Sequence, residues 1–105
     1  MRDSPFPKRL KEARLKANIS QKKLGIAAGM DAFVASSRMN HYEKGTHHPL
    51  FDSVSRIAEV LDTPTSYFYE VDDTLAELNL LVGTQEKVIQ QSCLAVFKDK
   101  TSTNN

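Results

Sequence analysis

Residues 36–45 read SSRMNHYEKG, and their polar side chains recur at a spacing that suits one face of a helix. When each residue advances by about 100°, Met39 and Tyr42 fall within roughly 40° of Ala35 and form an apolar side. The other side carries hydroxyl, amide and imidazole groups and one cation, from Ser36, Ser37, Asn40, His41 and Lys44. Solvated helix faces usually carry Glu and Lys pairs instead. Such groups can hydrogen-bond the edges of base pairs in the major groove of DNA, and they are equally compatible with an ordinary polar surface.

These side chains differ in the base contacts that they can make. The amide of Asn40 suits a bidentate contact with adenine, and the guanidinium of Arg38 suits guanine. Arg38 projects near the apolar side, so a phosphate contact from the flank is its alternative. His41 can donate or accept, and the hydroxyls of Ser36 and Ser37 can adapt to any base. The competing interpretation of this face is an ordinary polar surface.

The charge of the chain is divided unevenly along its length. Residues 1–56 hold eleven Lys or Arg and five Asp or Glu, a net charge of +6, whereas residues 57–105 carry −5. A basic half made of helices favours a polyanionic partner such as DNA.

Length and composition set the broader limits. A chain of 105 residues with 40% hydrophobic content fits one small domain with an appended segment. The single cysteine, Cys93, excludes an internal disulfide framework. The N-terminal MRDSPFPKR has no apolar stretch of a secretory signal, and no apolar run is long enough to cross a membrane. We therefore expect a cytoplasmic protein that does not enter a membrane.

Five short helices are predicted to position the polar face. The pattern predicts helices near residues 6–17, 20–29, 53–61 and 64–70, around the central helix that ends at Gly45. Asp31 or Ser36 can cap this central helix, and the sequence does not choose between them. No convincing strand is present, so the fold class is all-α. The second and third helices form a helix-turn-helix candidate.

Beyond residue 71 the chain becomes acidic and apolar. Residues 72–97 are predicted to form a C-terminal helical segment, with a capping box at Thr74 and Glu77. Residues 74–97 are more apolar than a surface helix pair requires, so we expect them to dimerise the protein; folding back on the chain's own core is the alternative. Residues 98–105 are predicted to form a disordered tail.

Six segments, in order, resemble the Cro/lambda-repressor type helix-turn-helix family, also called the xenobiotic response element family. They are LKEAR at 10–14, ISQKKL at 19–24, Gly29, YEKG at 42–45, Pro49 and RIAEVL at 56–61. The likeness covers residues 6–71 and implies a five-helix, lambda-repressor-like DNA-binding domain followed by a C-terminal helical extension.

The resemblance also implies roles for particular residues. Gln21 holds the position at which the family contacts a DNA phosphate, and Arg14 and Glu43 hold the positions of an ion pair between the first and third helices. Gly29 and Glu43 are separated by about four more residues than is usual in the family, so the base-contacting positions are found by counting back from Glu43. They then fall on the face derived from periodicity, at Ser36, Ser37 and His41, with Arg38 and Asn40 nearby. Phosphate contacts are expected from Gln21, Lys22, Lys44, Thr46 and His47.

The function predicted from these features is a sequence-specific transcriptional regulator. We expect a repressor that binds a palindromic operator on double-stranded DNA as a homodimer, with half-sites about 34 Å apart. The alternative is an antitoxin-like protein that inhibits a protein partner through residues 74–97 and represses its own operon. A domain that kept the fold and lost DNA binding is a weaker third possibility. No cofactor is expected, His41, His47 and His48 lack the spacing of a metal site, and no nucleophile with a base is found, so an enzyme is not expected.

Overall fold

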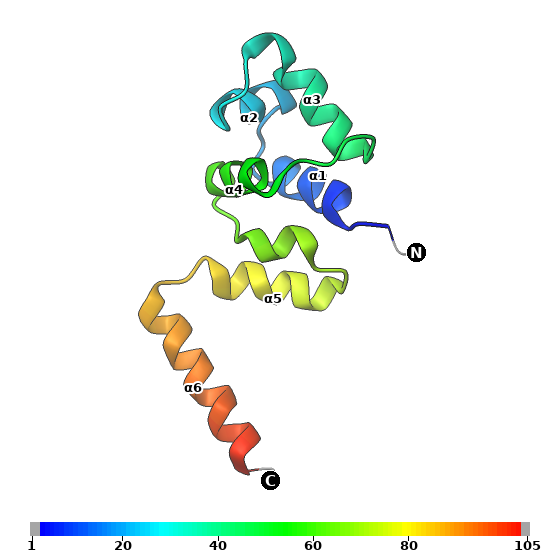
Figure 1. The fold of residues 1–105 in the computed structure, drawn as a ribbon. Helices are drawn as coiled ribbons and strands as arrows, with labels where there is room; N and C mark the ends of the chain where they lie inside the picture. Colours follow the sequence, from blue (N-terminus) through cyan, green and yellow to red (C-terminus); the bar gives the residue numbers. More distant parts are fainter. Residues whose placement is uncertain (1–2, 104–105) are drawn as a thin grey trace.

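The computed structural model describes residues 3–103, which form helices without a strand. The first five elements are α1 (Phe6–Lys16), α2 (Gln21–Ala27), α3 (Ala32–Lys44), α4 (Phe51–Val60) and the 3-10 helix η1 (Thr65–Tyr69). Two longer helices follow, α5 (Asp73–Gly83) and α6 (Lys87–Thr103). The all-α prediction, with a five-helix domain and a helical extension, is confirmed (Figure 1).

Local capping explains where the central helices begin and end. The Ser20 hydroxyl accepts a hydrogen bond from the Lys23 backbone N–H at 3.1 Å and caps α2. The Asp31 carboxylate accepts from the Phe33 N–H at 2.8 Å, so α3 begins at Asp31 and not at Ser36. Gly45 ends α3 in the left-handed conformation, with φ of 76°.

One core lies beneath α1 to α5. It is built from Phe6, Leu10, Ala13, Leu24, Ala28, Met39, Tyr42, Val54, Ile57, Ala58, Tyr67, Phe68 and Ala76. Every helix from α1 to α5 contributes at least one of these residues, whereas none comes from α6. The apolar side predicted for α3 therefore faces the core, and the polar side faces away from it.

The helix α5 is fastened to the domain by charged groups of α1. Arg9 is only 3% exposed and donates from Nε and Nη2 to the Glu70 carbonyl oxygen at 3.0 and 2.9 Å. Arg9 also pairs with Asp73 at 2.9 Å, and Lys8 reaches the same carboxylate at 3.2 Å. These bonds, first from Lys8 and then from Arg9, hold the pKa of Asp73 below its ordinary value. The start of α5 is thus tied to α1.

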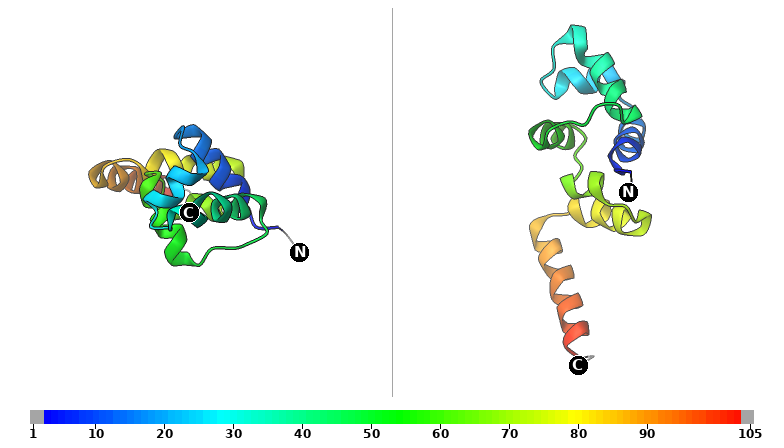
Figure 2. Two further views of the ribbon diagram at one scale, coloured as in Figure 1. Left: turned by 90° about the horizontal axis from the view of Figure 1, so that it is seen from above. Right: turned by 45° about the vertical axis from the view of Figure 1, so that its right-hand side comes forward.

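By contrast, α6 extends away from the other helices (Figures 1 and 2). The radius of gyration is 16.0 Å, whereas a compact chain of this length has about 13 Å. Each of Val88, Ile89, Leu94, Val96 and Phe97 is at least 44% exposed.

Two predictions about the C-terminal region need correction. The side chain that caps α5 is Asp72, which accepts from the Leu75 N–H at 2.9 Å, and not Thr74. The disordered tail predicted for residues 98–105 is wrong for residues 98–103, because α6 continues through Thr103. Residues 104 and 105 lie outside the described part of the chain.

Candidate nucleic-acid interface

The close approach of α2 and α3 fixes the direction in which α3 presents its side chains. Gly25 lies inside α2, and a Cβ added there would stand 2.8 Å from the Cβ of Ala35, which is fully buried. Real Cβ atoms do not approach so closely, so only glycine permits this crossing. The first turns of α3 are therefore held directly against α2, and α3 lies at the opposite end of the molecule from α6 (Figures 1 and 2).

A buried ion pair joins α1 to the end of α3. The Arg14 Nε atom lies 2.5 Å from Glu43 Oε2, and Arg14 Nη2 lies 3.1 Å from Oε1. The two side chains are 12% and 4% exposed, and Arg14 also donates to the Ile19 carbonyl oxygen at 3.0 Å. The structure thus brings together the two residues that the family resemblance pairs, in a bidentate geometry that restrains the angle between α1 and α3.

Gln21 extends this network from α2. Its Nε2 group donates to Glu43 Oε1 at 3.2 Å and to Asn40 Oδ1 at 3.3 Å. A primary amide has two N–H donors, so both are used by α3. A phosphate contact from the Gln21 amide nitrogen has to replace one of these bonds. Replacing the bond to Asn40 would free the oxygen that a bidentate contact with adenine requires.

Three of the predicted base-contacting residues are open to solvent. Ser36, Ser37 and Arg38 are exposed, and within the described residues their side chains make no hydrogen bond or ion pair. Arg38 lines a hollow shared with Ser53 and Arg56 of α4, which places it on the flank of α3 and not at the centre of its outward face. The serines point outward, as the helical projection predicts.

His41 is half-buried and is oriented by the loop that follows α3. Its Nδ1 atom lies 2.9 Å from the Thr46 hydroxyl oxygen, and that hydroxyl lies 3.2 Å from the His41 carbonyl oxygen. The His47 ring stacks on the His41 ring with centroids 4.4 Å apart. Thr46 and His47, predicted as phosphate contacts, therefore also hold the imidazole, and leave its Nε2 edge as the group able to meet a base.

Lysines stand beside this face on both helices. Lys22 on α2 and Lys44 at the end of α3 are exposed, and neither makes an ion pair within residues 3–103. A lysine without an internal partner is available for a phosphate, so these positions suit contacts that hold a helix in register on DNA without specifying bases.

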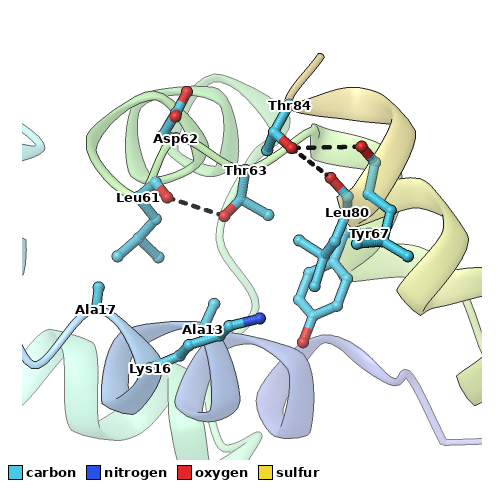
Figure 3. A pocket seen from close by; sticks show the side chains of 10 residues that line it. Ala13, Lys16, Ala17, Leu61, Asp62, Thr63, Tyr67, Leu80 and Thr84 are labelled. Carbon is cyan, nitrogen blue, oxygen red and sulfur yellow. Dashed lines mark hydrogen bonds between the residues drawn. The ribbon is translucent and has the colours of Figure 1, made fainter. Parts of the chain in front are cut away.

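A separate pocket of about 280 Å³ lies on the other side of the domain, among α1, the end of α4, η1 and α5. Figure 3 shows Lys16 and Tyr67 at its walls, with the hydroxyls of Thr63 and Thr84. Both threonines already donate to backbone carbonyls, at 3.0 and 2.8 Å. Burial, with the Glu12 carboxylate as the next cause, raises the pKa of Tyr67 above its ordinary value. This pocket lies away from the polar face of α3.

One residue on this face was missed by the sequence analysis. Because α3 begins at Asp31, the helix has an extra turn before Ser36, and Phe33 lies on that turn with its side chain 98% exposed. The helical projection could have found it, since Phe33 falls at about 160° from Ala35, but the start of the helix was undecided.

In residues 3–103, α2 packs against the inner side of α3 and leaves the polar side of α3 outward, which is the arrangement of a helix-turn-helix. The profile of the helix-turn-helix family matches residues 10–68, and the chain belongs to this family, in its Cro/lambda-repressor type. The crystal structure of the transcriptional regulator BswR is similar to this chain over 95% of its length and 99% of that chain, at 37% identity and a TM-score of 0.86. No curated protein sequence matches the chain significantly.

The described residues contain neither a membrane-spanning helix nor a group of side chains suited to a metal ion. None of their helices has the length and apolar character needed to span a membrane. Nor do residues 3–103 bring together three His, Cys, Asp or Glu side chains that could hold a metal ion.

Proposed function

We propose that this DNA-binding regulator is a repressor that occupies a palindromic operator as a dimer. The observation that carries the proposal is the outward face of α3, where Ser36 and Ser37 have no partner in the described part of the chain and Lys22 and Lys44 stand beside them. Repression by occupying an operator needs only DNA binding and a sufficient concentration of protein. The cytoplasm is part of this proposal, because the DNA must be accessible there.

We assign the base contacts to Ser36, Ser37, Asn40 and His41, with Arg38 contacting either a base or a phosphate from the flank. The major groove presents a distinct pattern of donors and acceptors for each base pair, and these side chains offer both kinds of group. The phosphate contacts go to Gln21, Lys22, Lys44, Thr46 and His47. We assign the Arg14–Glu43 pair an architectural role, because both side chains are largely buried and the pair joins α1 to the end of α3.

We assign dimerisation to α6 and the outer side of α5. Ile89, Cys93, Val96 and Phe97 fall on one side of α6 at helical spacing. Ile89, Val96 and Phe97 are each at least 44% exposed, and Cys93 is partly buried. Most helical stability in proteins comes from packing of an apolar face, and no described side chain of α6 belongs to the core, so a packing partner would stabilise it. The same face of a second copy supplies one by a self-complementary contact.

The dimer proposal is tested by one added charge on either side of α6. Ile89→Glu places a carboxylate on the apolar side, and Gln91→Glu places the same group on the opposite side as a matched control. Light scattering should show a monomer for Ile89→Glu and a dimer for the control. A dimer for both variants would show that α6 is not the interface.

The proposed function is tested by selecting bound duplexes from a random pool. A dimer of this kind should recover two inverted half-sites at a fixed spacing, whereas a chain that contacts only phosphates should recover no consensus. The selected duplex should then repress a reporter gene when it overlaps the promoter.

The antitoxin-like alternative is favoured by a different observation on α6. Leu94 is 55% exposed and lies about 140° around the helix from Ile89, outside the side proposed for dimerisation. A protein partner could cover it in the dimer. The test needs a strain in which the chain neutralises a toxic protein. If Leu94→Glu abolishes this neutralisation but still represses the reporter gene, the alternative is supported.

A further inference from the structure

Phe33 is the most exposed large apolar side chain in the described structure, although it lies in a well-defined element. Its ring is 98% exposed on the first turn of α3. The Asp31 carboxylate accepts a hydrogen bond from the Phe33 backbone N–H, and Ala35, two residues later, is fully buried against α2. The exposure therefore follows from the direction of the side chain and not from fraying of the helix.

The position of Phe33 continues the proposed DNA-contacting face. Phe33 precedes Ser37 by four residues and His41 by eight, so the three side chains share one side of α3. With a rise of about 1.5 Å per residue, Phe33 lies about 6 Å beyond Ser37 along the helix. Since successive base pairs are about 3.4 Å apart, the extra turn extends the face by about two base pairs.

The chemistry of the ring identifies the group that it can contact. Phe33 cannot form a hydrogen bond through its side chain, whereas its neighbours on this face have hydroxyl and imidazole groups. In the major groove, the characteristic apolar group on a base edge is the C5-methyl of thymine, which phenylalanine contacts favourably. A fully exposed ring loses more water on such a contact than a half-buried one.

We infer that Phe33 contacts a thymine methyl group about two base pairs outside the positions contacted by Ser37. The inference rests on the proposed function, because it requires α3 to lie in the major groove. It makes Phe33 a specificity-determining residue that acts through the one-turn extension of α3.

The test uses the full chain and duplexes selected from a random pool by the wild-type protein and by Phe33→Ala. The wild-type consensus should contain a thymine at the edge of each half-site that is absent from the Phe33→Ala consensus. Replacing this thymine by deoxyuridine removes only the methyl group and keeps every hydrogen-bonding group of the base. Wild-type affinity should fall about fourfold, as expected for one buried methyl group, and Phe33→Ala should bind both duplexes equally.

A matched control is Phe51→Ala, which removes a ring that is 65% exposed at the start of α4. It should retain the wild-type consensus and the full sensitivity to deoxyuridine. Both variants should keep the wild-type unfolding temperature, because neither ring is buried.

The outcomes separate this inference from the proposed function. If the wild-type protein selects no consensus, the proposed function fails, and the role of Phe33 with it. If it selects a palindrome but Phe33→Ala selects the same bases with the same deoxyuridine penalty, only the inference about Phe33 is wrong. If the Phe33→Ala variant changes its oligomeric state but selects the wild-type consensus, the ring contacts protein and the inference is wrong.

Discussion

The helices α3 and α6 both expose side chains to solvent along their length, but they differ in how they are held and in what they expose. The inner side of α3 buries Ala35, Met39 and Tyr42, so the chain itself fixes its orientation. None of the described side chains of α6 belongs to the core, and those that it exposes include Val88, Ile89, Leu94, Val96 and Phe97. The difference fits the proposal that α3 is already oriented before it meets DNA, whereas α6 would gain its packing from a second copy of the chain.

The exposed side chains of α3 and α6 also differ in their chemistry. The outward side of α3 offers hydroxyls, an amide and an imidazole beside lysines, which suits a polar anionic groove. The open side of α6 offers Ile89, Val96 and Phe97, which suit another apolar helix. We therefore propose that one end of the molecule contacts DNA and that the other contacts protein.

The largest expected effect on stability comes from removing a buried aromatic ring of the core, and an exposed ring of α6 provides the comparison. Phe68→Ala removes a fully buried ring of the core and should lower the free energy of unfolding by about 3–5 kcal/mol. Phe97→Ala removes a ring that is 64% exposed on α6 and should mainly weaken the dimer. Urea unfolding at several protein concentrations separates the two effects. An equal, concentration-independent loss for both variants would contradict the contrast between the regions.

Breaking the buried ion pair should loosen the attachment of α3. Arg14→Ala leaves the Glu43 carboxylate, 4% exposed, without its cation and should cost about 3–5 kcal/mol of stability together with DNA affinity. Arg56→Ala is the control, because its pair with Asp52 is more than half exposed and should contribute only about 0.5 kcal/mol or less. Denaturant titrations and binding assays should therefore distinguish the two variants clearly.

Asn40 accepts a hydrogen bond from Gln21 in the free protein, and we propose that it contacts adenine in the DNA-bound protein. Asn40→Ala should reduce discrimination between operator and scrambled DNA by about 1–3 kcal/mol, because it removes a bidentate contact. Stability should change less, since its bond from Gln21 is long and partly exposed, at 3.3 Å. Wild-type affinity for the operator with undiminished specificity would remove Asn40 from the base contacts.

The lysines beside α3 should affect binding without affecting sequence preference. Replacing Lys22 and Lys44 together by Gln should weaken binding to all duplexes and reduce the slope of log affinity against log salt by about two. Lys98→Gln, on α6, is the control for a change of net charge and should leave the slope unchanged.

The smallest effect concerns the attachment of α5. The pKa of Asp73 is held below 3.8 by Lys8 and then Arg9, so its folded-state pKa is below that of the unfolded chain. The contribution of Asp73 to stability is therefore fully present when the pH is above the pKa of the unfolded chain. It is lost as the pH falls through the pKa of the folded chain. In denaturant titrations Asp73→Asn should be slightly less stable than wild type at about pH 6, and the difference should shrink as the pH falls through the folded-state pKa of Asp73.

Much of the fold could be predicted from local patterns, because caps and helical spacing act over a few residues. The start of α3 could not, since Asp31 and Ser36 are both good caps. In the structure Asp31 is the cap, and Ala35, directly before Ser36, packs inside the helix against Gly25 of α2, a contact that a local pattern does not reveal.

The C-terminal region and the site were less predictable, because they also depend on contacts between residues far apart in the sequence. Arg9 looks like any basic residue of an exposed helix, yet it is buried and holds the start of α5. The bond between Gln21 and Asn40 joins two helices and has no local signal. The α6 helix continues past residue 97 through a polar stretch whose composition alone favours disorder.

The most direct measurement of the central claim compares wild type with a variant in which Ser36, Ser37 and His41 are all replaced by alanine. These side chains lie on the outward side of α3, so the variant should keep its helical circular dichroism and its oligomeric state. In fluorescence anisotropy titrations its preference for the selected duplex over a scrambled one should fall well below that of wild type, to what Asn40, Arg38 and Phe33 still supply, while the phosphate contacts remain. A variant that still prefers the selected duplex as strongly as wild type would show that this side of α3 does not contact the bases.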